Sequence, residues 1–358
     1  MTPEANLQVG EDFRQPQYRQ EVFLRFYQFH LKHRAHPGCV YALLPWLRER
    51  FDWDDEQALW FAFLNGNTQN PVTSLLLHQH GDTPAKADSC VSFWNDKYGV
   101  LAWDTDRRYH KKNFGSAVKD YVNKVGTSQH DFWSEAGEGG WPELWNTASE
   151  IYSFGRLSTW SYLEYLYIFG YSLDADSLML SDRSGSRSHR NGLCIVTGLD
   201  EYDWHQSNPS FDGQYGSPLL ADLTEIGDEL LVEAKRRTQG TEYERDTTLL
   251  TLESALCTYK SWHRPNRRYA GVYIDMFHDR IKLAERNFGP LPLWWEAREQ
   301  IWPNFLLIEH NPGDPGVHKL KQNWYRLTGD VPVLGHEDPV FWNEFDRNIA
   351  ATSFGMFR

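Results

Sequence analysis

The chain has 358 residues and a mass of 41.9 kDa, enough for one large domain or two ordinary ones with a substantial core. Its 36 Lys and Arg against 49 Asp and Glu give a formal charge of -13, which excludes a uniformly basic nucleic-acid coat protein but not a local basic groove. Aromatic residues make up 15% of the chain although its mean hydropathy is low, a balance typical of a helical protein with rings in its core and clefts.

The sequence also narrows the cellular setting. No stretch approaches 18 consecutive apolar residues, and residues 1–17 are polar and acidic, so we expect neither a membrane span nor a secretion signal. The cysteines form no CxxC pair and no zinc-site spacing. These features predict a cytoplasmic protein.

Apolar positions recur at helical spacing through most of the chain. A helix is predicted at about 54–65, because Asp52 and Asp54 lie where N-caps belong and Gly66 follows the last apolar position. Another begins at Trp141 and Pro142, with proline at an early helical position. Further helices are predicted over 157–167, 217–237, 242–260 and 269–287.

Residues 171–216 interrupt this pattern. They are rich in Ser, Asp, Gly and Asn and have few periodic apolar positions, which predicts a long functional loop. Because the chain has no repeat, no heptads and no strong alternation, the predicted fold class is mostly α. The predicted domains are an N-terminal helical segment (1–50), a helical catalytic core (51–288) and a C-terminal Pro- and Trp-rich extension packed on the core (289–358).

Three windows contain no Asp or Glu in this acidic chain, at about 107–119, 183–199 and 254–274. The third places aromatic rings between its cations. Cations neutralise phosphates while rings stack on an extruded base, so the three windows together favour DNA binding. For any one window, the alternative is a solvated helix face or a contact with an acidic part of the same protein.

The segment GSRSHRNG, residues 185–192, combines small residues, hydroxyls and two arginines. Small residues let backbone N–H groups approach an anion, and Arg187 and Arg190 can each bind two phosphate oxygens. The chain has no Walker loop and no GxGxxG segment after a strand, so a P-loop or a Rossmann site is not supported. The segment is either an anion site or a flexible surface loop.

Glu253, Cys257 and Lys260 are spaced i, i+4 and i+7 on a predicted helix and therefore share one face. A carboxylate, a thiol and an amine in line suit a general base, a nucleophile and a phosphate clamp. The alternative is a small core cysteine beside an ordinary surface Glu–Lys pair. Downstream, Asp275 is a candidate ligand for a divalent metal such as Mg²⁺ or for an amine.

These motifs resemble those of the α-glutamyl/putrescinyl thymine pyrophosphorylases, also described as amino acid:DNA transferases of bacteriophages. The resemblance covers about residues 50–285. It is carried by Phe154-Gly155-Arg156, Trp160, Glu164, the segment 185–192, Glu253, Cys257, Lys260 and Arg268-Tyr269-Ala270-Gly271 ahead of Asp275.

The resemblance implies a helical fold related to the helical DNA glycosylases, and a transferase that acts on a hypermodified thymine. In this family a hydroxymethyluracil DNA kinase first pyrophosphorylates 5-hydroxymethyluracil in double-stranded DNA. The transferase then displaces pyrophosphate with an amino acid or polyamine. Base flipping would account for the aromatic richness of the chain. The setting would be the host cytoplasm of a phage-infected cell, with Mg²⁺ as the one candidate cofactor.

The resemblance also implies roles for individual residues. Glu164 or Glu253 would accept the proton of the amine, because an ammonium ion has no lone pair with which to attack. Asp275 would bind the substrate ammonium or Mg²⁺, whereas direct displacement gives Cys257 no necessary role. The expected pyrophosphate and DNA ligands, with Tyr269 as a stacking platform, are Arg156, Ser186, Arg187, Ser188, His189, Arg190, Lys260, Arg267, Arg268 and Tyr269.

Two other functions fit the same patterns. A helical DNA glycosylase-like enzyme would use a similar groove but would cut the N-glycosidic bond with an Asp and a water, releasing free base. A noncatalytic DNA-binding protein would use the basic windows for the DNA backbone alone and would show a steep salt dependence without chemistry. The sequence leaves open which amine attacks.

Overall fold

The computed structural model describes residues 16–35, 39–104, 108–171, 173–180, 188–198, 217–259, 272–303 and 307. Across these ranges it contains α-helices and two short 3-10 turns but no strand, which confirms the mostly α class. The α-helices are α1 (Pro16–His33), α2 (Val40–Phe51), α3 (Asp55–Thr68), α4 (Pro71–His80), α5 (Ala87–Asp96), α6 (Arg108–Val125), α7 (Gln129–Glu138), α8 (Gly140–Ser149), α9 (Arg156–Ile168), α10 (Ser188–Thr197), α12 (Ser217–Thr238), α13 (Leu249–Tyr259), α14 (Val272–Phe288) and α15 (Pro292–Ile301).

Helix α3 begins where its sequence predicts. The Asp54 carboxylate accepts the backbone N–H of Gln57 at 2.8 Å, and the Gln57 side chain accepts the N–H of Asp54, which completes a capping box. The prediction that Gly66 ends the helix is wrong, since α3 continues to Thr68. An added Cβ at Gly66 would lie 2.9 Å from Cζ of Phe154, so this glycine admits the Phe154 ring against the helix.

The prediction of a long loop over 171–216 is wrong for Ser188–Thr197, which form α10. This helix is buried on nearly all sides, and its buried residues include the polar His189, Arg190 and Asn191, so polar composition is a poor guide to a surface loop here. Its Gly192 faces α13 so closely that an added Cβ would lie 2.0 Å from the carbonyl oxygen of Leu256. Gly192 thus lets two helix backbones touch.

The later predicted helices are confirmed with shifted ends. The runs 217–237 and 269–287 correspond to α12 and α14. The run predicted at 242–260 starts with a short 3-10 turn, Glu244–Asp246, and becomes α-helical only at α13. No helix in the part of the chain that the structure describes is long and apolar enough to cross a membrane.

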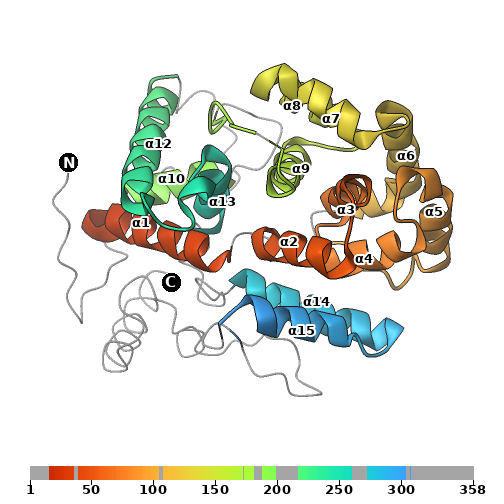
Figure 1. Cartoon of the computed structure of the whole chain (residues 1–358). Coiled ribbons are helices and arrows are strands. Elements are labelled where there is room, and N and C mark those ends of the chain that lie inside the picture. Colours follow the sequence, from red (N-terminus) through yellow and green to blue (C-terminus); the bar gives the residue numbers. More distant parts are fainter. Residues whose placement is uncertain are drawn as a thin grey trace.

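The helices form two groups (Figure 1). Helices α1, α10, α12 and α13 pack on one another in one group, and α3 to α9 pack as a chain of neighbours in the other. Helix α2, which has Pro45 in its interior, packs on α9 and on α15, and α14 packs on α4 and α15. Segments far apart in the sequence, α9 on one side and the group of α1, α10, α12 and α13 on the other, therefore lie next to each other.

Candidate functional site

A buried cluster of charged and polar side chains joins the start of α9 to α10 and α13. Arg156 Nη1 lies 2.8 Å from Glu253 Oε1, and His189 Nδ1 lies 3.2 Å from the same oxygen. Arg156 Nη2 also lies 3.2 Å from His189 Nε2. The three side chains are almost completely removed from solvent. Three residues that the sequence singled out from separate segments are therefore in mutual contact.

The contacts fix how His189 carries its proton. A guanidinium only donates hydrogen bonds, so Nε2 of His189 accepts from Arg156 and the ring proton resides on Nδ1, which faces Glu253. Arg156 is the first residue of α9, where a cation opposes the helix dipole, and Glu253 offsets that cost. The guanidinium also lies 5.1 Å from the centre of the Trp160 ring.

Trp160 belongs to the core. It is buried, and its ring meets those of Trp141 and Trp145 edge-on. The role of Trp160 in this structure is therefore core packing.

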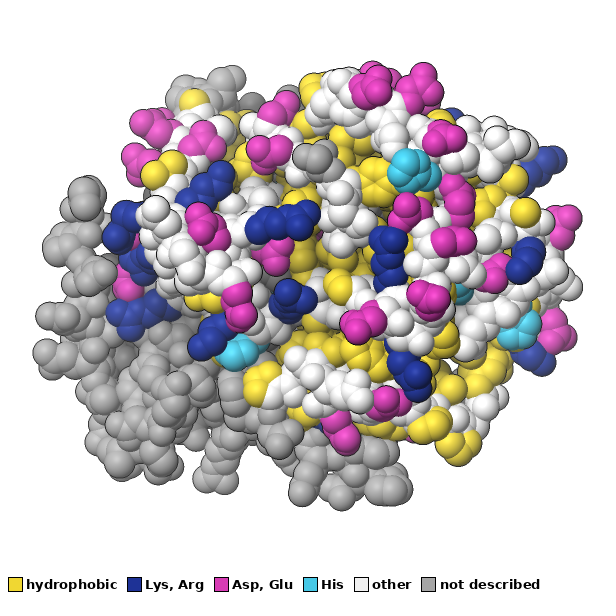
Figure 2. All heavy atoms as spheres, in the orientation of Figure 1, with side chains coloured by type: hydrophobic (Ala, Val, Ile, Leu, Met, Phe, Trp, Pro, Cys, Tyr) yellow, Lys and Arg dark blue, Asp and Glu magenta, His cyan; other side chains and the backbone are white. Residues whose placement is uncertain are grey.

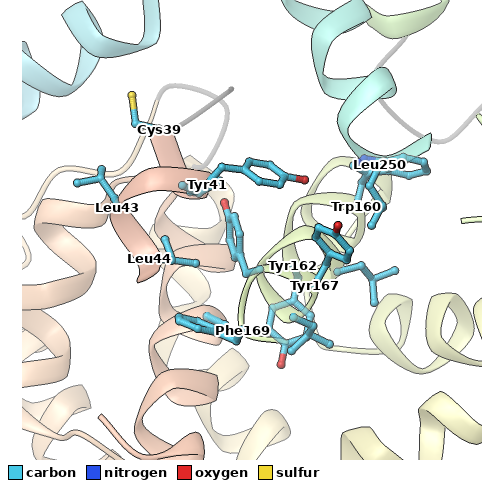
Figure 3. Packing of buried hydrophobic residues seen from close by; sticks show 14 of the residues in the cluster. Cys39, Tyr41, Leu43, Leu44, Trp160, Tyr162, Tyr167, Phe169 and Leu250 are labelled. Carbon is cyan, nitrogen blue, oxygen red and sulfur yellow. The ribbon is translucent and has the colours of Figure 1, made fainter. Parts of the chain in front are cut away.

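Glu164, two turns along α9 from Arg156, accepts hydrogen bonds from two hydroxyl groups. Ser254 Oγ donates to Glu164 Oε1 over 2.6 Å, and the Tyr41 hydroxyl donates to the same oxygen over 3.0 Å. Figure 3 shows Tyr41 reaching from α2 towards α9, among the surrounding apolar side chains. Ser254 directly follows Glu253, so the Glu164 site and the ion cluster share one turn of α13.

The environment of Glu164 favours its protonated form. The pKa of Glu164 is raised to about 8, mainly by burial and in part by the nearby Glu253 charge, against the hydrogen bonds from Ser254 and Tyr41 that lower it. Burial also raises the pKa of Tyr41 well above its usual range, so its hydroxyl remains a donor. A carboxyl group of this kind exchanges a proton near neutral pH, which is what a general acid or base requires.

The other described candidates lie close to this cluster. Ser188 is the first residue of α10 and is partly exposed, whereas Arg190 is buried and donates to the carbonyl oxygen of Leu180 over 2.6 Å. Both belong to a helix, so the interpretation of 185–192 as a loop is corrected for these residues. Cys257 is partly exposed and lies one turn after Glu253, on the same side of α13.

The remaining predicted residues are not placed by the structure. Asp275 is on α14, but its side chain is not among those described. Within the described ranges, no group of three or more His, Cys, Asp or Glu side chains is arranged to hold a metal ion. The predicted residues that lie outside the described ranges are Ser186, Arg187, Lys260, Arg267, Arg268 and Tyr269.

Sequence reasoning missed two parts of the site. Tyr41 is 123 positions from Glu164, and nothing in its own neighbourhood signals a polar role. Ser254 directly follows the candidate Glu253 in the sequence, and this adjacency is the one signal that could have identified Ser254 as part of the site.

Figure 2 shows hydrophobic side chains between the two helix groups in the middle of this face, with Lys and Arg side chains beside them.

Comparison with known proteins identifies the family of the chain. Residues 40–268, more than half of the chain, match the model of the family described as amino acid:DNA transferase. A serinyltransferase of Salmonella phage ViI is 29% identical over 301 residues, which cover 78% of this chain and 72% of that protein. No solved structure matches significantly. The matched range starts just before Tyr41 and includes α9, α10 and α13, and we conclude that the chain belongs to the amino acid:DNA transferase family.

Proposed function

We propose that this protein joins an amino acid or amine to pyrophosphorylated 5-hydroxymethyluracil in DNA and releases pyrophosphate. The amine nitrogen bonds to the methylene carbon on position 5 of the base. The bond from that carbon to the pyrophosphate oxygen breaks, and its electron pair leaves with pyrophosphate. The proton lost by the amine passes to the enzyme. Family membership supports the amino acid transfer to DNA, and the chemistry of Glu164 supports the proton step.

The observation that carries the proposal is the buried Glu164 carboxyl. Because its pKa is raised to about 8, the ionised form of Glu164 is basic enough to take a proton from an amine near neutral pH. The Tyr41 and Ser254 hydroxyls stabilise the carboxylate that must exist before each turnover. Glu253 is less suited to this task, since its carboxylate is held by Arg156 and His189.

Glu253 and its partners instead position the site. The ion cluster ties α13 to the start of α9, and the same turn of α13 holds the Ser254 hydroxyl on Glu164. Ser188 starts α10, where backbone N–H groups favour an anion, so this end of the helix suits the leaving pyrophosphate. We assign the same role to Ser186 and Arg187, which precede it. The remaining assignments, to pyrophosphate or DNA phosphates, are Arg190, Lys260, Arg267 and Arg268, with Tyr269 against the flipped base.

The test uses duplex DNA that carries pyrophosphorylated 5-hydroxymethyluracil. Serine is the first amine to try, given the name of the phage ViI relative, followed by a mixture of amino acids and polyamines with Mg²⁺ or with a chelator. Mass spectrometry of the nucleosides and an assay of pyrophosphate report the reaction. The expected result is a base–amine adduct with one pyrophosphate released for each adduct.

Two variants sharpen this test. Glu164→Gln keeps the hydrogen-bond acceptor but removes the base, so adduct formation should fall by a factor of about 100 or more. Glu225→Gln, on the exposed surface of α12, is the matched control and should retain activity. Full activity of Glu164→Gln would refute the role of Glu164. Release of free base would indicate a glycosylase, and DNA binding without product would favour a noncatalytic protein.

A further inference from the structure

One face of α6 is exposed along its whole length and carries no acidic residue. Its side chains follow one another at intervals of three and four positions, which places them on one side of the helix. These residues, called here the α6 face, are Tyr109, Lys112, Ser116, Lys119 and Asn123, and all five are exposed.

The two lysines of the α6 face have no acidic partner within the part of the chain that the structure describes. Many other cations of this acidic protein are paired, including Arg48 with Asp55 and Lys86 with Asp82. The one acid of α6, Asp120, accepts the backbone N–H of Tyr152. The two positive charges therefore stand unneutralised on a protein whose formal charge is -13.

Aromatic rings flank the N-terminal end of this face. Tyr109 is 60% exposed and Tyr152 is 40% exposed, so both rings are open to contact with a partner. A hydrogen bond with Tyr109 raises the pKa of Tyr152, so the two rings are neighbours. Lysines neutralise phosphates and tyrosine hydroxyls donate hydrogen bonds to phosphate oxygens, so the two side chains together suit a nucleic-acid backbone.

The α6 face also leads to the candidate site. His110, next to Tyr109, points inward, and its Nε2 lies 3.3 Å from the Ser158 hydroxyl on α9. Its Nδ1 lies 3.4 Å from the hydroxyl of Ser153, which follows Tyr152. Since α9 begins at Arg156, the exposed tyrosines are joined through His110 to the first turn of the helix that carries Glu164.

We propose that the α6 face binds the sugar–phosphate backbone of duplex DNA next to the base that is modified. This rests on the proposed function. Lys112 and Lys119 are seven residues apart, about 10 Å along the helix axis, which spans about three phosphates of one strand. Lysine, serine, asparagine and tyrosine side chains contact phosphates without reading sequence, so this surface supplies affinity and orientation rather than base specificity.

The test measures binding of the full-length protein to a fluorescently labelled, unmodified duplex over a series of NaCl concentrations. The double variant Lys112→Ala, Lys119→Ala should bind more weakly at low salt. Its plot of log Kd against log salt should be shallower by about 1.8, because each phosphate contact contributes about 0.9. Tyr109→Ala should weaken binding and leave the slope unchanged.

Lys235→Ala is the matched control, since Lys235 is an exposed lysine on α12 that has no ion pair within the described ranges. It should bind like the unmodified protein. If the double variant keeps both affinity and slope while the unmodified protein binds DNA and forms adduct, the α6 face is not the DNA surface although the proposed function stands. If the unmodified protein neither binds DNA nor forms adduct, both proposals fail.

Discussion

Replacing Glu164 with Gln removes one ionisation while the amide oxygen still accepts from Tyr41 and Ser254. The pKa of this carboxyl is about 8 in the folded protein against the usual 4.5. The folded protein therefore holds the proton more tightly than the unfolded chain does. The stabilisation of the folded protein by this tighter proton binding is fully present below pH 4.5 and is lost as pH rises to about 8. At about 1.4 kcal/mol per pH unit, the free energy of unfolding falls by about 5 kcal/mol.

Urea unfolding at pH 5, 6, 7, 8 and 9 measures this directly. The stability of Glu164→Gln relative to the unmodified protein should increase by about 1.4 kcal/mol per pH unit between pH 5 and 8, and then stay constant. Contributions from other titrating groups cancel in this difference. Glu225→Gln, at an exposed position of α12, is the control for the Glu to Gln exchange itself. A difference for Glu164→Gln that does not change with pH would show that the carboxyl is already ionised in the folded protein at pH 5.

The raised pKa of the Glu164 carboxyl also predicts the pH dependence of catalysis. With saturating amine, the rate of adduct formation should rise with pH and level off near pH 8, as the Glu164 carboxylate becomes populated. A rate that already levels off near pH 5 would contradict the role of Glu164 as the base.

Three further substitutions test the packing around the site. Glu253→Gln should lower the free energy of unfolding by about 3–5 kcal/mol in urea, because the buried Arg156 loses its counter-charge. Gly192→Ala should cost more than about 2 kcal/mol, since the added methyl meets the α13 backbone, whereas Gly137→Ala on α7 meets open space and should change stability by less than about 1 kcal/mol. Asp54→Ala should cost about 1 kcal/mol in thermal unfolding through loss of the capping box, and an unchanged midpoint would contradict that role.

The helices that the sequence located well carry local signals. Asp54 and Gln57 fix the start of α3 through contacts between residues three positions apart, and this spacing is visible in the sequence. Helix α10 carries no such signal. Its Ser188, Asn191 and Gly192 indicate a loop, but burial by α1, α12 and α13 overrides the local preference. Gly192 is the clearest case, because a glycine is required there by the closeness of the Leu256 backbone and not by a turn.

The candidate site likewise combines residues that the sequence identifies with contacts that only the packing of the helices creates. Glu164, Glu253, Arg156 and His189 were identified by residue type and resemblance, and the structure brings the last three into contact. Their partnership depends on how α9 crosses α10 and α13, which spacing along the chain does not encode. Tyr41 could not be found from the sequence, since its hydroxyl matters only because α2 packs on α9.

The proline inside α2 bears on how firmly the hydroxyl of Tyr41 is held against Glu164. Pro45 has no N–H to donate to the carbonyl oxygen of Tyr41, four residues earlier. The turn that carries the tyrosine is therefore attached to the rest of α2 by one hydrogen bond fewer than a continuous helix would have. The hydroxyl that contacts Glu164 is thus carried by the less tightly bonded first turn of α2, whereas the carboxyl itself is on α9, which has no proline in its interior.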